Sequence, residues 1–483
     1  MARFQAGSPK GEHMTDRSPR PSEVGFSLLN RRQLLSGVVG LTGAALLAGC
    51  GSSSKPSAGA TSSTAGGSPS TAAGSSSSAA AAGSSSSAAA AAAGGKATGN
   101  LTWGSNASDA KPKAAFQAVA DGFPNKNVAI KINTTDHNTF QDNITTYLQQ
   151  PDDIFNWFSG LRMRFFASKG LAGDISDVWK GVSGMGDAFK TASTGDDGKQ
   201  YLVPVSYYAW GIHYRKSVFA QKGYKIPTKW DEMMALMDKM KSDGITPLAS
   251  ANDGKWPQQG MFDQLNLRIN GYQFHVDLMA GKKDWSGPEV KAVFDQWAKI
   301  LPFYQEGGNG RTWQSAADDW AAGKTGMYLL GNFVTSNFKD QTIVDDIDFF
   351  PFPEINPAHG QDAVEAPIDG MMMAAKPKNP DAAKEFLGFL ATSTAQSSYV
   401  KVDGSVVMAN SAVDTAGYSA IQKKAFDLIS KAKYITQFLD RDSNPQFASN
   451  VAGPAFADFL ADSTKSTSIM KSMQDQAKAI FAG

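Results

Sequence analysis

The feature that most constrains the fold is a tract of small residues between Gly51 and Gly99. It consists almost entirely of Ser, Ala, Gly and Thr, and only Lys55 and Lys96 carry a charge. Such a composition cannot bury enough apolar surface to offset the entropy lost on ordering the chain. We therefore expect residues 50–99 to form a flexible tether, with a mean reach of roughly 35–42 Å for a coil of this length.

The segment before this tract has the pattern of an export signal. A basic Asn30-Arg31-Arg32-Gln33 leads into an apolar run from Leu34 to Leu47. That run, about fourteen residues, is too short to span a bilayer stably and is typical of a signal peptide, which we place at residues 1–49. The paired arginines resemble a twin-arginine signal, but Asn30 and Leu34 depart from its usual pattern. Both twin-arginine export and general secretion therefore stay open.

Cys50 closes the apolar run in the sequence Leu47-Ala48-Gly49-Cys50 and is the single cysteine of the chain. The four residues resemble the lipobox of bacterial lipoproteins, which implies that Cys50 is acylated. A lone cysteine between a signal and a flexible tract has nothing to pack against, so a buried structural thiol is the weaker interpretation. We expect an extracytoplasmic protein anchored to the cell membrane through its lipid.

The composition of the whole chain argues against several classes of function. Lys and Arg number 46 and Asp and Glu number 45, so the charge balance gives no reason to expect a nucleic-acid partner. The five histidines lack metal-ligand spacing, and no nucleophile elbow or phosphate-binding glycine loop is present in the sequence. We expect no metal, no cofactor and no enzymatic activity.

From Asn100 onward, short apolar strands alternate with amphipathic helices. This pattern predicts an α/β fold with mostly parallel sheets. The expected strands are 101–103, 128–132, 151–157, 201–205, 210–214 and 244–248. The expected helices are 113–123, 140–148, a run from Thr228 as N-cap to Lys241, 381–390 and several after Ser419.

Six segments in order resemble extracellular solute-binding protein family 1, the maltose-binding-like lipoproteins of ABC importers. They are Pro151-Asp152-Asp153-Ile154-Phe155-Asn156-Trp157-Phe158, Tyr201–Lys216, Pro227-Thr228-Lys229-Trp230-Asp231-Glu232, Gly323-Lys324-Thr325-Gly326-Met327, Gly331-Asn332-Phe333 and Ala382-Ala383-Lys384-Glu385-Phe386-Leu387. The resemblance covers nearly the whole folded region. Many relatives carry Trp where this chain has Phe333, which argues against specificity for maltose.

The resemblance implies a type II periplasmic-binding-protein-like fold, with two α/β lobes, hinge strands and a ligand cleft between them. By this likeness lobe 1 comprises 100–210 with 367–390, and lobe 2 comprises 211–366 with 391–483, joined near 205–212 and 352–367. The implied function is capture of a carbohydrate outside the membrane and delivery to the ABC transporter permease subunits. The implied partners are the sugar, the permease and the membrane, and the protein is expected to be a monomer.

Sugar binding requires flat aromatic side chains for the apolar faces of the ring and polar groups for its hydroxyls. Five tryptophans lie near expected strand ends or turns, and four others lie in helical contexts typical of a core: Trp179, Trp230, Trp297 and Trp320. The expected ligand-binding set is Trp103, Asn106, His137, Asp153, Trp157, Phe158, Tyr208, Trp210, Trp256, Trp313, Asn332, Phe333 and Asp369. For each tryptophan a core role is the competing interpretation, and His137 can equally be an exposed loop residue.

Two other functions stay open at this point. The same fold can bind a charged solute such as a polyamine or phosphodiester, which would require a charged cleft. A secreted glycoside hydrolase would need two carboxylates facing each other across a cleft. Asp152 and Asp153 do not meet that need, because adjacent strand residues point to opposite faces. The identity of the sugar, its linkage and its chain length are not encoded in these patterns.

Overall fold

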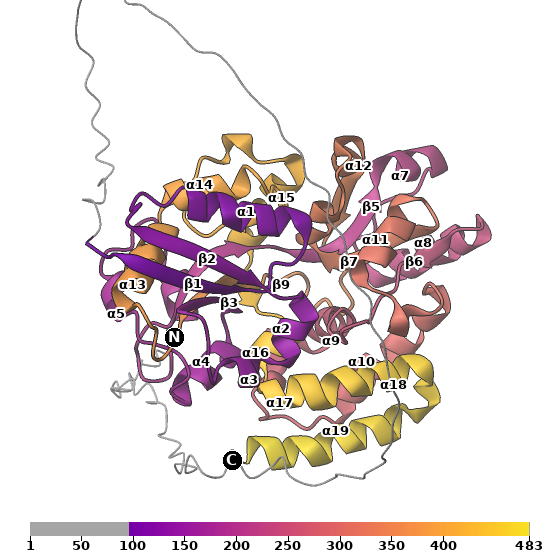
Figure 1. Cartoon of the computed structure of the whole chain (residues 1–483). Coiled ribbons are helices and arrows are strands. Elements are labelled where there is room, and N and C mark those ends of the chain that lie inside the picture. Colours follow the sequence, from indigo (N-terminus) through magenta and orange to yellow (C-terminus); the bar gives the residue numbers. More distant parts are fainter. Residues whose placement is uncertain (1–95, 483) are drawn as a thin grey trace, which may run out of the picture. The chain divides into compact units, whose positions relative to one another are not determined.

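A computed structural model describes residues 96–482 of the chain, which form two lobes around separate sheets (Figure 1). The predicted signal peptide, the lipidation site Cys50 and nearly all of the tether lie outside the described residues. Within 96–482, no helix combines the length and apolar character needed to cross a membrane.

The first lobe is built on a six-stranded sheet with the strand order β11-β4-β10-β3-β1-β2. The strands are β1 (Gly99–Ser105), β2 (Val128–Thr134), β3 (Ile154–Phe158), β4 (Leu202–Tyr207), β10 (Ile368–Met373) and β11 (Val407–Met408). β1 pairs in parallel with β2 and β3, whereas β10 runs antiparallel to β3 and β4.

The second lobe is built on a four-stranded sheet with the order β6-β7-β5-β8. Its strands are β5 (Trp210–Arg215), β6 (Thr246–Leu248), β7 (Thr325–Gly331) and β8 (Ile347–Phe350). β5 runs antiparallel to β7 and β8, and only β6 and β7 are parallel. The prediction of an α/β fold is therefore confirmed, but the prediction of mostly parallel sheets is wrong. Strands that enter from the other lobe, such as β10, run against their neighbours.

Helices cover both sheets. Those before β10 are α1 (Ala110–Asp121), α2 (His137–Asp142), α3 (Ile144–Tyr147), α4 (Leu161–Ser168), α5 (Ser176–Trp179), α6 (Asp187–Ala192), α7 (Lys216–Lys222), α8 (Trp230–Ser242), α9 (Gln259–Met279), α10 (Pro288–Ala298), α11 (Trp313–Ala321) and α12 (Gln341–Asp346). Those after it are α13 (Pro380–Leu390), α14 (Ser393–Val400), α15 (Ala420–Lys431), α16 (Leu439–Asp442), α17 (Pro445–Phe447), α18 (Gly453–Ala461) and α19 (Ser466–Phe481).

Three connections join the lobes. Tyr208 and Ala209 link β4 to β5, and residues 351–367, which include β9 (Ala363–Glu365), link β8 to β10. The third connection follows β11 and includes β12 (Tyr434–Thr436), which pairs with β9. Residues from 391 to 408 lie with the first lobe, since α14 packs on α1 and β11 pairs with β4 (Figure 1). This corrects the assignment of everything after Leu390 to the second lobe.

Each lobe has an aromatic core. In the first lobe Trp103 packs on Phe116 and Phe386, with ring centroids 5.1 and 5.5 Å apart. In the second lobe Trp297 packs on Phe456 and Phe459 at 5.4 and 5.1 Å. Burial of several large aromatic rings in each lobe removes a large apolar area from water, which stabilises the fold. The four tryptophans predicted to be core residues are all buried, as is Trp285.

Two local predictions differ from the structure. The helix expected over 140–148 is divided into α2 and α3 at Asn143. The N-cap position of α8 is Lys229 rather than Thr228. The carboxylate of Glu232 accepts hydrogen bonds from the backbone N–H groups of Thr228 and Lys229, at 2.8 and 3.1 Å, so the end of the helix is capped by its own third residue.

Candidate ligand-binding site

A cavity of about 150 Å³ lies between the two lobes. Residues from the ends of strands and from the loops of both lobes form its walls, together with the third connection. Its lining residues include Asn106, Asp109, His137, Gln141, Asn156, Trp157, Phe158, Ser206, Tyr208, Trp210, Trp256, Trp313, Phe333, Asp369, Tyr399, Asp403, Phe438, Asp440 and Arg441. The cavity is therefore rimmed by aromatic rings and by several polar and charged groups.

One wall of the cavity is a cluster of aromatic rings, mainly from the second lobe. Trp210 stacks on Phe438 with centroids 4.7 Å apart and planes inclined by 28°. Phe333 meets Trp313 edge to face at 5.3 Å and Tyr208 at 5.2 Å, while Trp256 lies 6.1 Å away. These rings brace one another, so their faces stay fixed when a solute enters.

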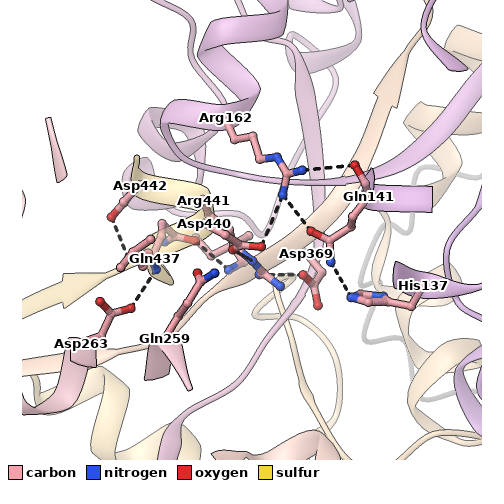
Figure 2. A network of polar contacts seen from close by, with 12 residues as sticks. His137, Gln141, Arg162, Gln259, Asp263, Asp369, Gln437, Asp440, Arg441 and Asp442 are labelled. Carbon is pink, nitrogen blue, oxygen red and sulfur yellow. Dashed lines mark hydrogen bonds and ion pairs between the residues drawn. The ribbon is translucent and has the colours of Figure 1, made fainter. Parts of the chain in front are cut away.

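Arg441 lies at the centre of the polar part of the site (Figure 2). Its Nη1 donates to Asp369 Oδ1 at 2.8 Å and its Nη2 donates to the Tyr208 hydroxyl at 3.0 Å. The guanidinium also lies 4.0 Å from the ring centroid of Phe158. Two charge-assisted hydrogen bonds and a cation–π contact hold the side chain in one orientation.

A second arginine extends this network into the first lobe. Arg162 Nη1 donates to Gln141 Oε1 at 2.8 Å and pairs with Asp440 Oδ2 at 3.4 Å. Gln141 Nε2 lies 2.7 Å from His137 Nε2, and Figure 2 marks this contact with a dashed line. The two arginines and the carboxylates of Asp369 and Asp440 balance in charge, which is the condition for keeping ions in a buried site.

Burial raises the pKa of the two aspartates of this network and lowers the pKa of His137. It raises the pKa of Asp369 and of Asp440, and the neighbouring arginines oppose both shifts. Burial, helped by the positive charge of Arg441, lowers the pKa of His137 to about 4. His137 is therefore neutral at physiological pH and can accept or donate a hydrogen bond without adding charge.

The short helix α16 places Asp440 and Arg441 between the lobes. Leu439 N at its start donates to Asp263 Oδ2 of α9 at 2.8 Å, and Gln437 N donates to Asp442 Oδ2 at 3.0 Å. On the side of the first lobe, Gly160 has φ of 104°, and a Cβ there would lie 2.7 Å from the Arg441 carbonyl oxygen. Glycine is needed at this position because of both its backbone angle and this close approach.

Two hydrogen bonds join the lobes at the cavity. Trp256 Nε1 of the second lobe donates to Asn138 Oδ1 of the first at 3.1 Å. Gln314 Nε2 of α11 donates to Asp109 Oδ1, at the start of α1, at 3.0 Å. Trp256 and Asp109 both line the cavity, so these bonds form only when the lobes come together around it.

The structure brings most of the sequence-predicted site residues to this cavity. Asn106, His137, Trp157, Phe158, Tyr208, Trp210, Trp256, Trp313, Phe333 and Asp369 all line it. Their role in binding a ligand stays a prediction. Their gathering follows from their positions at strand ends and connections, where the loops of both sheets meet.

Three predicted residues lie elsewhere. Trp103 is buried behind the cavity, where its Nε1 donates to Asn156 Oδ1 at 2.6 Å. Asp153 accepts from Thr102 N at 2.8 Å and from Asn379 N at 3.0 Å, so its carboxylate connects strand β1 to the start of α13 in the first lobe. Asn332 is buried at the end of β7 and does not line the cavity, although the adjacent Phe333 does.

Asp440 and Arg441 line the cavity but were not predicted from the sequence. They lie in a segment that the sequence pattern placed among the C-terminal helices. The only local signal is a cluster of charges, Asp440-Arg441-Asp442, directly after the apolar pair Phe438-Leu439. Charged residues are rarely buried unless they are paired with an opposite charge. A charge cluster in the sequence does not show, however, whether its residues are buried or where the cavity lies.

The chemistry of the cavity suits a polar, uncharged solute with an apolar face. Aromatic faces can pack on C–H groups, while carboxylate, amide and hydroxyl groups can bond hydroxyls. Among the described residues, no three His, Cys, Asp or Glu side chains form a group that could hold a metal ion. Two lobes closed around such a cavity define a solute-binding protein.

Comparisons with known proteins agree with this class. The profile of the bacterial extracellular solute-binding proteins matches residues 106–397, more than half of the chain. The chain belongs to this family. An uncharacterised ABC transporter extracellular-binding protein of Pyrococcus horikoshii is 26% identical over 382 residues, which cover 76% of this chain and 82% of that protein.

Solved structures are similar over the whole folded region. The bacterial solute receptor AcbH, described as having an exclusive preference for β-D-galactopyranose, is 44% identical with a TM-score of 0.77. The match covers 80% of this chain and 100% of that chain. A chitin oligosaccharide binding protein shares the fold, with 18% identity and a TM-score of 0.73. That match covers 80% of this chain and 100% of the other chain.

Proposed function

We propose that this protein captures a single neutral pyranose, β-D-galactopyranose or a close relative, outside the membrane. The protein is the carbohydrate-binding component of an ABC importer. The observation that carries the proposal is the presence of an aromatic wall and a network of arginine–aspartate pairs in one cavity of about 150 Å³. The 44% identity to a galactopyranose receptor supports the choice of sugar.

Each arginine of the network already has a carboxylate partner, which favours a neutral ligand over the phosphodiester considered above. Arg162 and Arg441 are matched by Asp440 and Asp369, with pair distances of 3.4 and 2.8 Å. An added net charge on the ligand would leave one of these ions without its partner in a buried site, which is costly. A sugar hydroxyl can donate a hydrogen bond to a carboxylate or accept one from a guanidinium, and it does so without breaking the ion pairs.

We further propose that the sugar is bound without turnover and that acylated Cys50 tethers the receptor to the membrane. Release of the sugar to the permease then follows opening of the lobes, since the ligand contacts both lobes only when they are closed. Replacement of Cys50 by serine should release the exported protein from the membrane into the soluble fraction. Retention of that variant in the membrane would contradict the lipid anchor.

The test of the ligand is the melting temperature of the purified protein with D-galactose, D-glucose, D-mannose, maltose, chitobiose or spermidine in excess. A ligand at about 100 times its dissociation constant stabilises the native state by roughly 2.7 kcal/mol, which gives a clear upward shift. We expect the largest shift with galactose and recovery of the sugar unchanged by chromatography. A shift with spermidine alone would refute the carbohydrate ligand, and hydrolysis of the disaccharides would refute binding without turnover.

A further inference from the structure

Asp369 presents one carboxylate oxygen to Arg441 and leaves the other free for a solute. Oδ1 accepts from Arg441 Nη1 at 2.8 Å, and no described residue donates a hydrogen bond to Oδ2. The Asp369 side chain keeps 34% of its exposure, whereas that of Arg441 keeps 8%. Because Asp369 lines the cavity, its exposed part faces the space that a ligand would occupy.

Contacts within the protein hold Arg441 in one orientation. Its two Nη groups are committed to Asp369 and Tyr208, and its plane lies over Phe158. A planar guanidinium held at both ends cannot rotate without breaking a buried hydrogen bond. Arg441 thus orients the Asp369 carboxylate and favours its ionised form.

We propose that Arg441 is a positioning residue for sugar recognition, which directs Asp369 Oδ2 toward a ligand hydroxyl and maintains that oxygen as a hydrogen-bond acceptor. This inference rests on the proposed carbohydrate ligand and assigns Arg441 a specific task through its hydrogen bond with Asp369. An ionised carboxylate accepts hydrogen bonds at both oxygens, whereas a protonated one donates from one of them.

The surroundings of Asp369 explain why the arginine is needed. Burial raises the pKa of the Asp369 carboxyl, Asp440 acts in the same direction, and Arg441 opposes the shift. The other titratable groups near it are the hydroxyls of Tyr208, on the first connection, and Tyr399, on α14. Arg162 on α4 reaches this group only through Asp440. Arg441 is therefore the cation that pairs directly with Asp369.

Loss of Arg441 should make sugar affinity depend on pH. In Arg441→Met, burial and Asp440 act on Asp369 without an opposing charge, so the carboxyl takes up a proton at a higher pH than in the wild type. The ionised form is the one that accepts from the sugar hydroxyl. The affinity of the variant should therefore rise with pH between pH 6 and 8.5, and more steeply than that of the wild type.

The experiment is isothermal titration of the purified protein with D-galactose at pH 6.0, 7.0 and 8.5. For Arg441→Met we expect about 100-fold weaker binding at pH 6.0, the loss of one charged hydrogen-bonded group. The affinity should recover by up to about tenfold per pH unit as the carboxyl ionises. Arg441→Lys, which keeps the charge but cannot bridge Asp369 and Tyr208, should bind about tenfold more weakly than the wild type at every pH.

Two further variants separate positioning from a general loss of structure. Arg441→Met/Asp369→Asn removes the titrating group, so its binding should be weak and independent of pH. Arg164→Met removes an arginine of α4 that lies outside the cavity lining and pairs with Asp196 at 3.6 Å. This control should bind like the wild type.

Several results would overturn the inference. Wild-type affinity in Arg441→Met, or a weak affinity with no pH dependence, would remove the proposed role of Arg441. A pH slope that persists in the double variant would assign the titration to another group of the cavity, His137 or Asp440, and not to Asp369. Should Arg441→Met fail to fold, unchanged affinity in Arg441→Lys would be sufficient to refute the inference. If the wild type binds no neutral sugar, the proposed function itself fails and the role of Arg441 falls with it.

Discussion

The Tyr208 hydroxyl accepts a hydrogen bond from Arg441 Nη2 at 3.0 Å. Tyr208→Phe would leave a buried N–H of the guanidinium without a partner. We expect a free energy of unfolding about 1–3 kcal/mol lower than that of the wild type, the usual cost of a buried unsatisfied donor. Urea denaturation of the sugar-free protein measures this difference.

Tyr207→Phe is the matched control for this substitution. Tyr207 is the neighbouring residue and is also buried, but its ring packs against Phe189 on the other side of the strand. No described residue hydrogen-bonds to its hydroxyl, so its removal should change the unfolding free energy by less than about 0.5 kcal/mol. Equal losses in the two variants would mean that the Arg441 hydrogen bond is not the cause.

Single residues also show the limits of prediction from sequence. Aromatic residues at expected strand ends, such as Trp210 and Trp313, could be located because strand ends and loops of this fold converge on one cleft. Trp103 has the same local pattern but lies in the core, since its side chain points to the opposite face of the sheet toward Phe116. Sequence alone gives the alternation of faces along a strand but does not reveal which face is covered by a helix.

At the scale of helices and strands, local periodicity predicted most elements but not their pairing. The strands β4 and β5 were expected on either side of a lobe crossing, and each is found in a different sheet. The third connection and α16 were missed, because contacts of α16 with α4 and α9 join residues far apart in the sequence. Such long-range packing leaves no periodic signal in a four-residue helix.

The hydrogen bonds Trp256–Asn138 and Gln314–Asp109 join loops and helices of opposite lobes. Since these bonds exist only in the closed arrangement, their loss should shift the equilibrium toward opening and leave each lobe intact. For Asn138→Ala and for Gln314→Ala we expect sugar affinity about 3–10-fold lower, the value of one ordinary hydrogen bond. Stopped-flow fluorescence should show that the dissociation rate accounts for most of the change.

Gln117→Ala provides the control for these interlobe bonds. Gln117 donates to Asp121 at 2.9 Å within the exposed face of α1, so the bond does not depend on closure. This variant should keep wild-type affinity and dissociation rate. A loss as large as that of Gln314→Ala would indicate that any polar change in these helices weakens binding, and would contradict a role for the interlobe bonds in closure.

At the scale of the whole molecule, charge determines how salt should affect binding. The chain has a formal net charge of +1, and both arginines of the polar network are paired with carboxylates of the protein. Salt screens interactions between exposed charges much more than those of buried pairs. A neutral sugar carries no charge to be screened, so its dissociation constant should change by less than about twofold between 50 and 500 mM sodium chloride.

Titration calorimetry with D-galactose across that range of salt tests this expectation, and the protein's melting temperature without sugar controls for salt effects on the fold. A charged ligand would respond differently, because its attraction to the cavity would include a screened long-range component. A tenfold weakening of galactose binding at 500 mM salt with an unchanged melting temperature would mean that exposed charges contribute to capture. Constant affinity would leave the aromatic wall and the buried polar network as the source of binding energy, the arrangement that the cavity between the lobes provides.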